Sequence, residues 1–107
     1  MDSPEPKFVP VARLADLPLG SARAFEVGRK LVAVFHTAEG LFALDDHCPH
    51  SGGPLSEGDL RSDVVTCRWH GAGFRLSTGR SAGAMRCKPA TCFSVRVHDG
   101  WIEVEER

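Results

Sequence analysis

The chain has 107 residues, of which 42% are hydrophobic and 25% charged, and its formal net charge is −1. This length allows one domain, residues 1–107, with a modest core and no second catalytic domain. The near-neutral charge argues against nucleic-acid binding, and no apolar run reaches the roughly 18 residues that a membrane span needs.

Short apolar runs separated by turn residues predict an all-β domain. We expect strands at residues 8–11, 23–27, 31–35, 41–44, 64–67, 74–76, 93–97 and 101–104. One helical turn is expected at 14–17, and Asp99-Gly100 predicts a tight hairpin. Strands this short and regular favour a β-sandwich or small barrel. The polar tail at 1–7 lacks the apolar core of a signal peptide, so a cytoplasmic location is the default expectation.

Residues 46–76 interrupt this pattern, because glycine and proline are dense there. The segment contains Cys48 and His50 and then, after a gap of sixteen residues, Cys67 and His70. Two thiolates and two imidazoles can hold a Rieske-type [2Fe–2S] cluster, in which the cysteines bind one iron and the histidines the other. We therefore expect a small cluster-binding subdomain inserted in the β scaffold, with little apolar core of its own.

Zinc is the alternative for this set of side chains, because two cysteines and two histidines also satisfy a tetrahedral zinc site. Zinc frameworks usually pair cysteine with cysteine and histidine with histidine, whereas each pair here mixes the two types. A zinc-structured or redox-sensing interaction module therefore stays open as a hypothesis, and it predicts no turnover with any reductase.

The flanks of both pairs resemble the cluster loops of Rieske ferredoxins. The sequences are Cys48-Pro49-His50-Ser51-Gly52-Gly53-Pro54-Leu55 and Cys67-Arg68-Trp69-His70-Gly71-Ala72-Gly73-Phe74. Such proteins are the electron carriers of bacterial aromatic-ring dioxygenase systems, and the small subunits of NAD(P)H-dependent nitrite reductases are related to them. The resemblance covers most of the chain, since Pro89 and the stretch 95–100 also fit it.

The resemblance implies a function and a role for each ligand. Cys48 and Cys67 would bind the buried iron of one [2Fe–2S] cluster, and His50 and His70 the outer iron, where partners would dock. The chain would be a monomeric, non-catalytic one-electron carrier between a reductase and a terminal oxygenase. The alternative is the small subunit of a nitrite reductase, with the large subunit as partner.

The chain departs from the Rieske proteins of respiratory complexes at four positions. Their extra cysteines, joined by a disulfide, would fall at Gly53 and Trp69, and their serine and tyrosine hydroxyls at Ala72 and Phe74. Because hydroxyl donors stabilise the reduced cluster, their loss predicts a potential toward the lower end of the Rieske range.

Several other side chains are candidates for lesser roles. Leu55, Trp69, Phe74 and Pro89 could shield the cluster from water, and a partly exposed Trp69 could also serve in docking. Ordinary structural or surface roles are expected for His36, His47, His98, Cys87 and Cys92.

Basic residues gather in one part of the chain. Residues 61–96 hold seven Lys or Arg against Asp63 alone. If Arg68, Arg86 and Lys88 surround the exposed histidines, the docking partner should present an acidic surface.

Overall fold

The computed structural model describes residues 7–83 and 86–106, so the tail expected at 1–7 lies outside this range apart from Lys7. The predicted all-β class is confirmed. The strands are β1 (Lys7–Arg13), β2 (Ala22–Val27), β3 (Lys30–Thr37), β4 (Gly40–Asp45), β5 (Asp59–Arg61), β6 (Val64–Thr66), β7 (Gly73–Arg75), β8 (Ser81–Ala82), β9 (Cys92–Phe93), β10 (Val95–His98) and β11 (Trp101–Glu106). Two 3-10 turns are η1 (Leu14–Asp16), which confirms the predicted helical turn, and η2 (Leu55–Glu57). Within the described ranges, no helix is long and apolar enough to cross a membrane.

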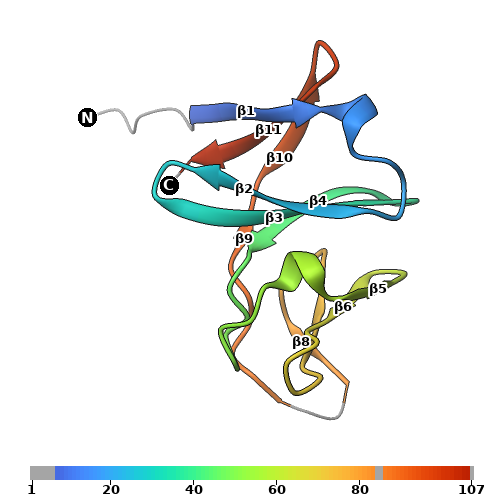
Figure 1. Cartoon of the computed structure of the whole chain (residues 1–107), viewed down its shortest axis with the longest axis vertical. Helices are drawn as coiled ribbons and strands as arrows, with labels where there is room; N and C mark the ends of the chain where they lie inside the picture. The colour runs from blue at the N-terminus through green and yellow to red at the C-terminus, as the bar shows by residue number, and fades with distance from the viewer. Residues whose placement is uncertain (1–6, 84–85, 107) are drawn as a thin grey trace.

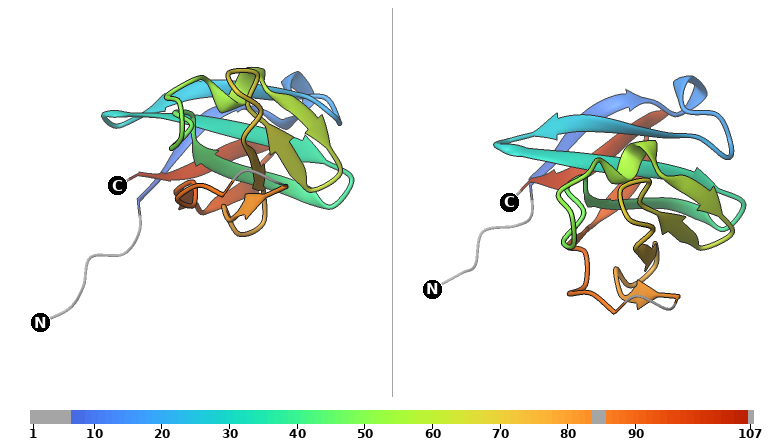
Figure 2. Two further views of the ribbon diagram at one scale, coloured as in Figure 1. Left: turned by 90° about the horizontal axis from the view of Figure 1, so that it is seen from below. Right: turned by 60° about the horizontal axis from the view of Figure 1, so that its bottom comes forward.

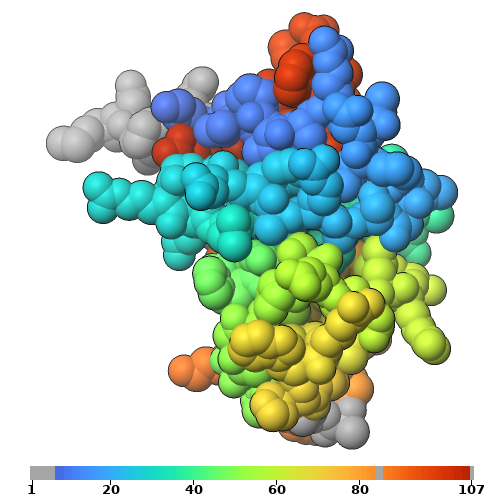
Figure 3. Space-filling view, in the orientation of Figure 1, coloured from blue at the N-terminus to red at the C-terminus, as the bar shows by residue number. Residues whose placement is uncertain are grey.

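The strands form three antiparallel sheets that are stacked in Figure 1. The upper sheet has the order β1-β11-β10, the middle sheet β2-β3-β4-β9 and the lower sheet β5-β6-β7-β8. The same succession of layers is visible when the bottom of the molecule is turned forward (Figure 2, right), and the layers form one continuous body in the space-filling view (Figure 3).

The middle sheet carries an apolar core on each of its faces. Val32 and Val34 of β3 belong to the core shared with Ile102 and Val104 of β11. The intervening Ala33 and Phe35 belong to the core shared with the lower sheet. Successive side chains of a strand point to opposite faces, so a strand buried on both faces needs a continuous apolar run. This explains why residues 32–35, which are all fully buried, form an unbroken hydrophobic sequence.

The hairpin predicted at Asp99-Gly100 joins β10 to β11. Both residues have positive φ, 51° at Asp99 and 79° at Gly100. Two consecutive positive φ angles are what a type I′ hairpin turn requires, and Asp-Gly supplies them at low cost.

The single strand predicted over residues 93–97 is wrong, because the chain changes sheet there. β9 pairs with β4 of the middle sheet, whereas β10 pairs with β11 of the upper sheet. Ser94 lies at the break, and its carbonyl accepts a hydrogen bond of 2.9 Å from the Glu105 amide. The alternating apolar pattern is shared by both strands and therefore gave no sign of the change.

Residues 46–76, for which little apolar core of their own is expected, contribute to a core that they share with the middle sheet. Leu55, Val65 and Phe74 are fully buried and pack with Phe35 and Leu44 of the middle sheet. The same core includes the side chains of Cys48 and Cys67. The lower sheet also continues past residue 76, with β8 pairing to β7.

Candidate metal centre

The first loop of the candidate centre, residues 47–54, is closed by backbone hydrogen bonds around Cys48. The Cys48 amide donates to the Gly53 carbonyl at 2.8 Å, and the Gly52 amide donates to the Cys48 carbonyl at 2.7 Å. Gly52 has a φ of 77°, which a side chain would strain. A bridge between His47 and Pro54 joins the two ends of the loop.

The second loop, residues 67–72, repeats the same frame. The Cys67 amide donates to the Ala72 carbonyl at 2.7 Å, and the Gly71 amide donates to the Cys67 carbonyl at 3.1 Å. Gly71 again has a positive φ, 79°, four residues after the cysteine. The two loops therefore present their cysteines in the same backbone setting, although their sequences differ.

The four predicted ligand side chains separate into two pairs. Cys48 and Cys67 are 2% and 1% exposed, and their side chains lie within hydrogen-bonding reach of each other. His50 and His70 are exposed, with ring centroids 5.9 Å apart and planes at 87°. The structure thus brings all four residues together, with the sulfurs inside and the imidazoles outside.

Hydrogen bonds to the sulfur of Cys48 stabilise its thiolate form. Burial raises the pKa of the Cys48 thiol. Hydrogen bonds from the Ser51 hydroxyl, from the Ser51 and His50 amides and from the Cys67 thiol outweigh burial and lower the pKa below its ordinary value. Because the thiolate is the form that binds metal, the loop favours the ligating state.

Trp69 packs against Gly53 across the two loops. A β-carbon at Gly53 would lie 2.8 Å from the Trp69 ring atoms Cγ and Cδ2 and 3.2 Å from Cys67 Sγ. The absence of a side chain at Gly53 therefore lets both the indole and the sulfur lie close to the Gly53 backbone. Trp69 is 54% exposed, as expected. The indole thus lies beside the site and remains accessible from solvent.

The other candidates for shielding divide by burial. Leu55 and Phe74 are fully buried in the core that contains the two cysteines, so they contribute to its apolar surroundings. Pro89 is exposed. Ala72, at the position of the missing serine hydroxyl, is also fully buried.

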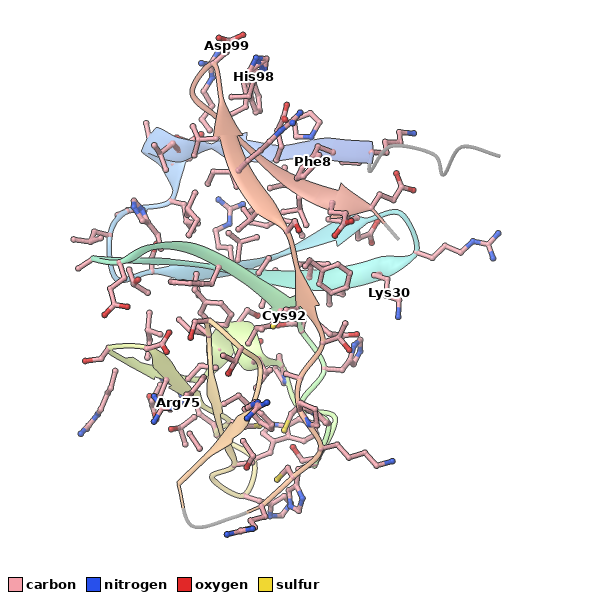
Figure 4. All side chains as sticks on the ribbon, turned by 180° about the vertical axis from the view of Figure 1, so that it is seen from behind. Phe8, Lys30, Arg75, Cys92, His98 and Asp99 are labelled. Atoms are coloured by element: carbon pink, nitrogen blue, oxygen red, sulfur yellow. The ribbon has the colours of Figure 1, made fainter. Side chains whose placement is uncertain are left out.

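The other three histidines contact groups other than the four proposed ligands. His36 Nδ1 is 2.7 Å from the Leu17 carbonyl, a structural contact on β3. His98 is the last residue of β10 and lies at the end of the molecule opposite the lower sheet (Figure 4). His47 is exposed, with Nδ1 3.2 Å from Asp45 Oδ1.

The two further cysteines are half-buried thiols. Cys87 packs against the lower core, and its amide donates to Ser81 Oγ at 3.2 Å. The Sγ of Cys92 on β9 would lie 3.0 Å from a β-carbon at Gly79. All four cysteines of the chain are free of disulfides in the structure.

Sequence reasoning missed two polar contacts at the site. Ser51 Oγ lies 3.4 Å from Cys67 Sγ, and Arg68 Nη2 lies 3.3 Å from Asp59 Oδ1. Both contacts join residues far apart along the chain. The presence of a hydroxyl residue directly after His50 was the one available sign of the first contact.

No three His, Cys, Asp or Glu side chains of the described segments are arranged to hold a single metal ion. A [2Fe–2S] centre of the Rieske type takes two protein ligands for each iron, so it needs no such group of three. The chemistry of the donors fits it, with two sulfurs together and two imidazoles together.

The sequence and the fold of the chain are similar to those of known proteins. Residues 7–95 match the family described as Rieske [2Fe-2S] domain. The chain is 37% identical over 90 residues to the biphenyl 2,3-dioxygenase ferredoxin component of Rhodococcus jostii (strain RHA1), which covers 84% of each chain. One solved structure is described as the complex of reduced oxygenase and oxidized ferredoxin in carbazole 1,9a-dioxygenase. It contains a chain that is similar to the present one, with a TM-score of 0.86, 32% identity and 94% coverage of both chains. A structure described as a nitrite reductase NADPH small subunit shares the fold alone, with a TM-score of 0.76 at 21% identity over 92% of this chain and 97% of that one.

Proposed function

Because this chain belongs to the Rieske [2Fe–2S] domain family, we propose that it carries single electrons from a reductase to a terminal oxygenase. It holds one Rieske-type [2Fe–2S] cluster and is an electron carrier, not an enzyme. When bound, the cluster accepts one electron and later releases it. The chain itself need not make or break any bond.

The proposed ligands are Cys48 and Cys67 for one iron and His50 and His70 for the other. One observation supports this assignment above the rest: the two sulfurs lie together in the core, and the two imidazoles lie together at the surface. The lower sheet and its loops would then be the cluster-binding part of a single domain. Its role is to fix the ligands and to keep water from the sulfurs.

The exposed imidazoles are the proposed route for electrons. His50 and His70 form the part of the centre that a partner can reach, whereas both cysteines are nearly inaccessible. Trp69, beside His70 and 54% exposed, offers an aromatic contact at the same edge. A partner that covers this edge would exclude water from the route of transfer.

The oxygenase is preferred over a nitrite reductase as the partner. The biphenyl dioxygenase ferredoxin component is 37% identical to this chain, whereas the nitrite reductase small subunit shows similarity of fold only. We also propose that the carrier is monomeric and works in the cytoplasm, where a reducing environment keeps Cys87 and Cys92 as thiols.

A redox titration of the purified protein followed by EPR tests the proposal. We expect a Rieske signal on reduction, with a midpoint potential toward the lower end of the family range of about −150 to +300 mV. The reduced protein, mixed in stopped flow with an oxidised dioxygenase, should then lose its signal as the oxygenase is reduced. Bound zinc with no EPR signal would contradict electron transfer, and transfer to a nitrite reductase large subunit alone would contradict the oxygenase as partner.

A further inference from the structure

A hydroxyl of the first loop reaches the sulfur of the second loop. Ser51 is half-buried, and its Oγ lies 3.4 Å from Cys67 Sγ. The Gly53 amide donates to the same oxygen, also at 3.4 Å. The serine hydroxyl therefore lies between a backbone amide of its own loop and a proposed ligand of the other loop.

The direction of the contact between Ser51 and Cys67 follows from the hydrogens that each group has available. The Gly53 N–H can only donate, so it uses a lone pair of Ser51 Oγ. A cysteine that binds metal is a thiolate, which has no hydrogen to give. The one hydroxyl hydrogen of Ser51 is then free to point at Cys67 Sγ, and the sulfur is the acceptor.

We propose that Ser51 sets the reduction potential of this centre by donating a hydrogen bond to the sulfur of Cys67. The inference rests on the proposed function, because it concerns the same centre. An added electron makes the centre more negative, and a donor aimed at a ligand sulfur stabilises that state over the oxidised one. Ala72 and Phe74 have no hydroxyl, so Ser51 supplies a hydroxyl donor that these two positions do not.

The test compares variants of the cluster-loaded protein. In Ser51→Ala the equilibrium constant for reduction should fall about tenfold, which for one electron is a potential about 59 mV lower. Ser51→Thr keeps the hydroxyl and should stay near the wild-type potential. Ser56→Ala is the matched control, because Ser56 contacts Asp46 through its backbone amide, which the substitution leaves in place.

A second measurement reads the hydrogen bond directly. Resonance Raman spectra report the iron–thiolate stretching frequencies, which depend on hydrogen bonding at the sulfur. These bands should shift in Ser51→Ala and should match the wild-type bands in Ser51→Thr and Ser56→Ala. A merely structural role of the side chain would leave them unchanged.

Each outcome decides the inference. A wild-type potential together with wild-type Raman bands in Ser51→Ala overturns it. If Ser51→Ala cannot hold the cluster, Ser51→Thr decides: wild-type values support the hydroxyl, and loss of the cluster in this variant too overturns it. A wild-type protein with no Rieske signal would contradict the proposed function itself, whereas the other negative outcomes contradict only the role of Ser51.

Discussion

His70 is held in a backbone conformation that side chains usually avoid. Its φ is 77°, in the left-handed region where a β-carbon costs energy. Such strain costs on the order of 1–3 kcal/mol and persists where the surrounding structure fixes it. Here the hydrogen bonds from Cys67 to Ala72 and from Gly71 to Cys67 fix the loop. The conformation places the imidazole beside that of His50 at the surface, which is what the proposed centre requires.

Removal of a single ligand should prevent cluster assembly. We expect Cys48→Ser or His70→Ala to yield protein without the visible absorption, the EPR signal or the iron and sulfide of the wild type, because one of the two irons would lose one of its two proposed protein ligands. His98→Ala is the matched control, since His98 lies at the far end of the molecule (Figure 4). An unchanged cluster in His70→Ala would contradict the ligand assignment.

The sequence was enough to propose the ligands of the centre but not to predict the contacts around them. Cys48 and His50 lie in one short stretch, as do Cys67 and His70, so their spacing is readable locally. The contact of Ser51 with Cys67 depends on how two separate loops meet, and no local pattern encodes that.

The two loops are coupled by a contact that leaves no room for a side chain. Gly53 of the first loop faces the indole of Trp69 and the sulfur of Cys67 in the second loop. A substitution at this contact in either loop therefore also disturbs the packing of the other loop.

Gly53→Ala should destabilise the protein and loosen the second loop. The added carbon would lie 2.8 Å from the Trp69 ring, and overpacking of this kind costs about 1–3 kcal/mol. Chemical denaturation of the holoprotein measures the loss. The double variant Gly53→Ala, Trp69→Ala should recover part of it, because the indole is then absent. Equal losses in Gly53→Ala with and without the indole would contradict the contact.

At the level of elements, the sequence predicted most strands but not the places where the chain switches sheets. The β9–β10 break was missed because both halves alternate alike and only their partners, β4 and β11, differ. β5 (Asp-Leu-Arg) and β8 (Ser-Ala) were missed because neither contains a run of apolar residues, and pairing with β6 and β7 defines them. These elements depend on tertiary contacts.

Across the whole molecule, the charged groups are not spread evenly. Arg86 and Lys88 are exposed in the segment between β8 and β9. Arg68 is exposed too, but it is paired with Asp59, which reduces its contribution to a positive surface. Arg96 pairs with Glu103 on the upper sheet. Arg61, Arg75 and Arg80 are exposed as well, so the basic character expected for residues 61–96 is not confined to Arg86 and Lys88.

Electron delivery should slow as salt is added if these two cations guide the partner. Added ions screen charges over about 10 Å at 0.1 M, so the association rate should fall with ionic strength. Stopped-flow reduction of an oxygenase by the Lys88→Glu variant should be slower than with wild type at low salt. Lys30→Glu is the matched control, because Lys30 lies on the middle sheet, away from the lower loops (Figure 4). Equal slowing in both variants would contradict local steering.

The ends of the described chain meet on the upper sheet. Lys7 pairs with Glu106 in the β1–β11 ladder, and their side chains form an ion pair of 3.8 Å. The two loops that carry the proposed ligands lie in the lower layer of the molecule in Figure 1. Adjacent ends of this kind permit circular permutation and insertion into another polypeptide. The domain can therefore be fused to another protein or attached to an electrode through its ends. The surface formed by His50 and His70 would then stay free to exchange electrons.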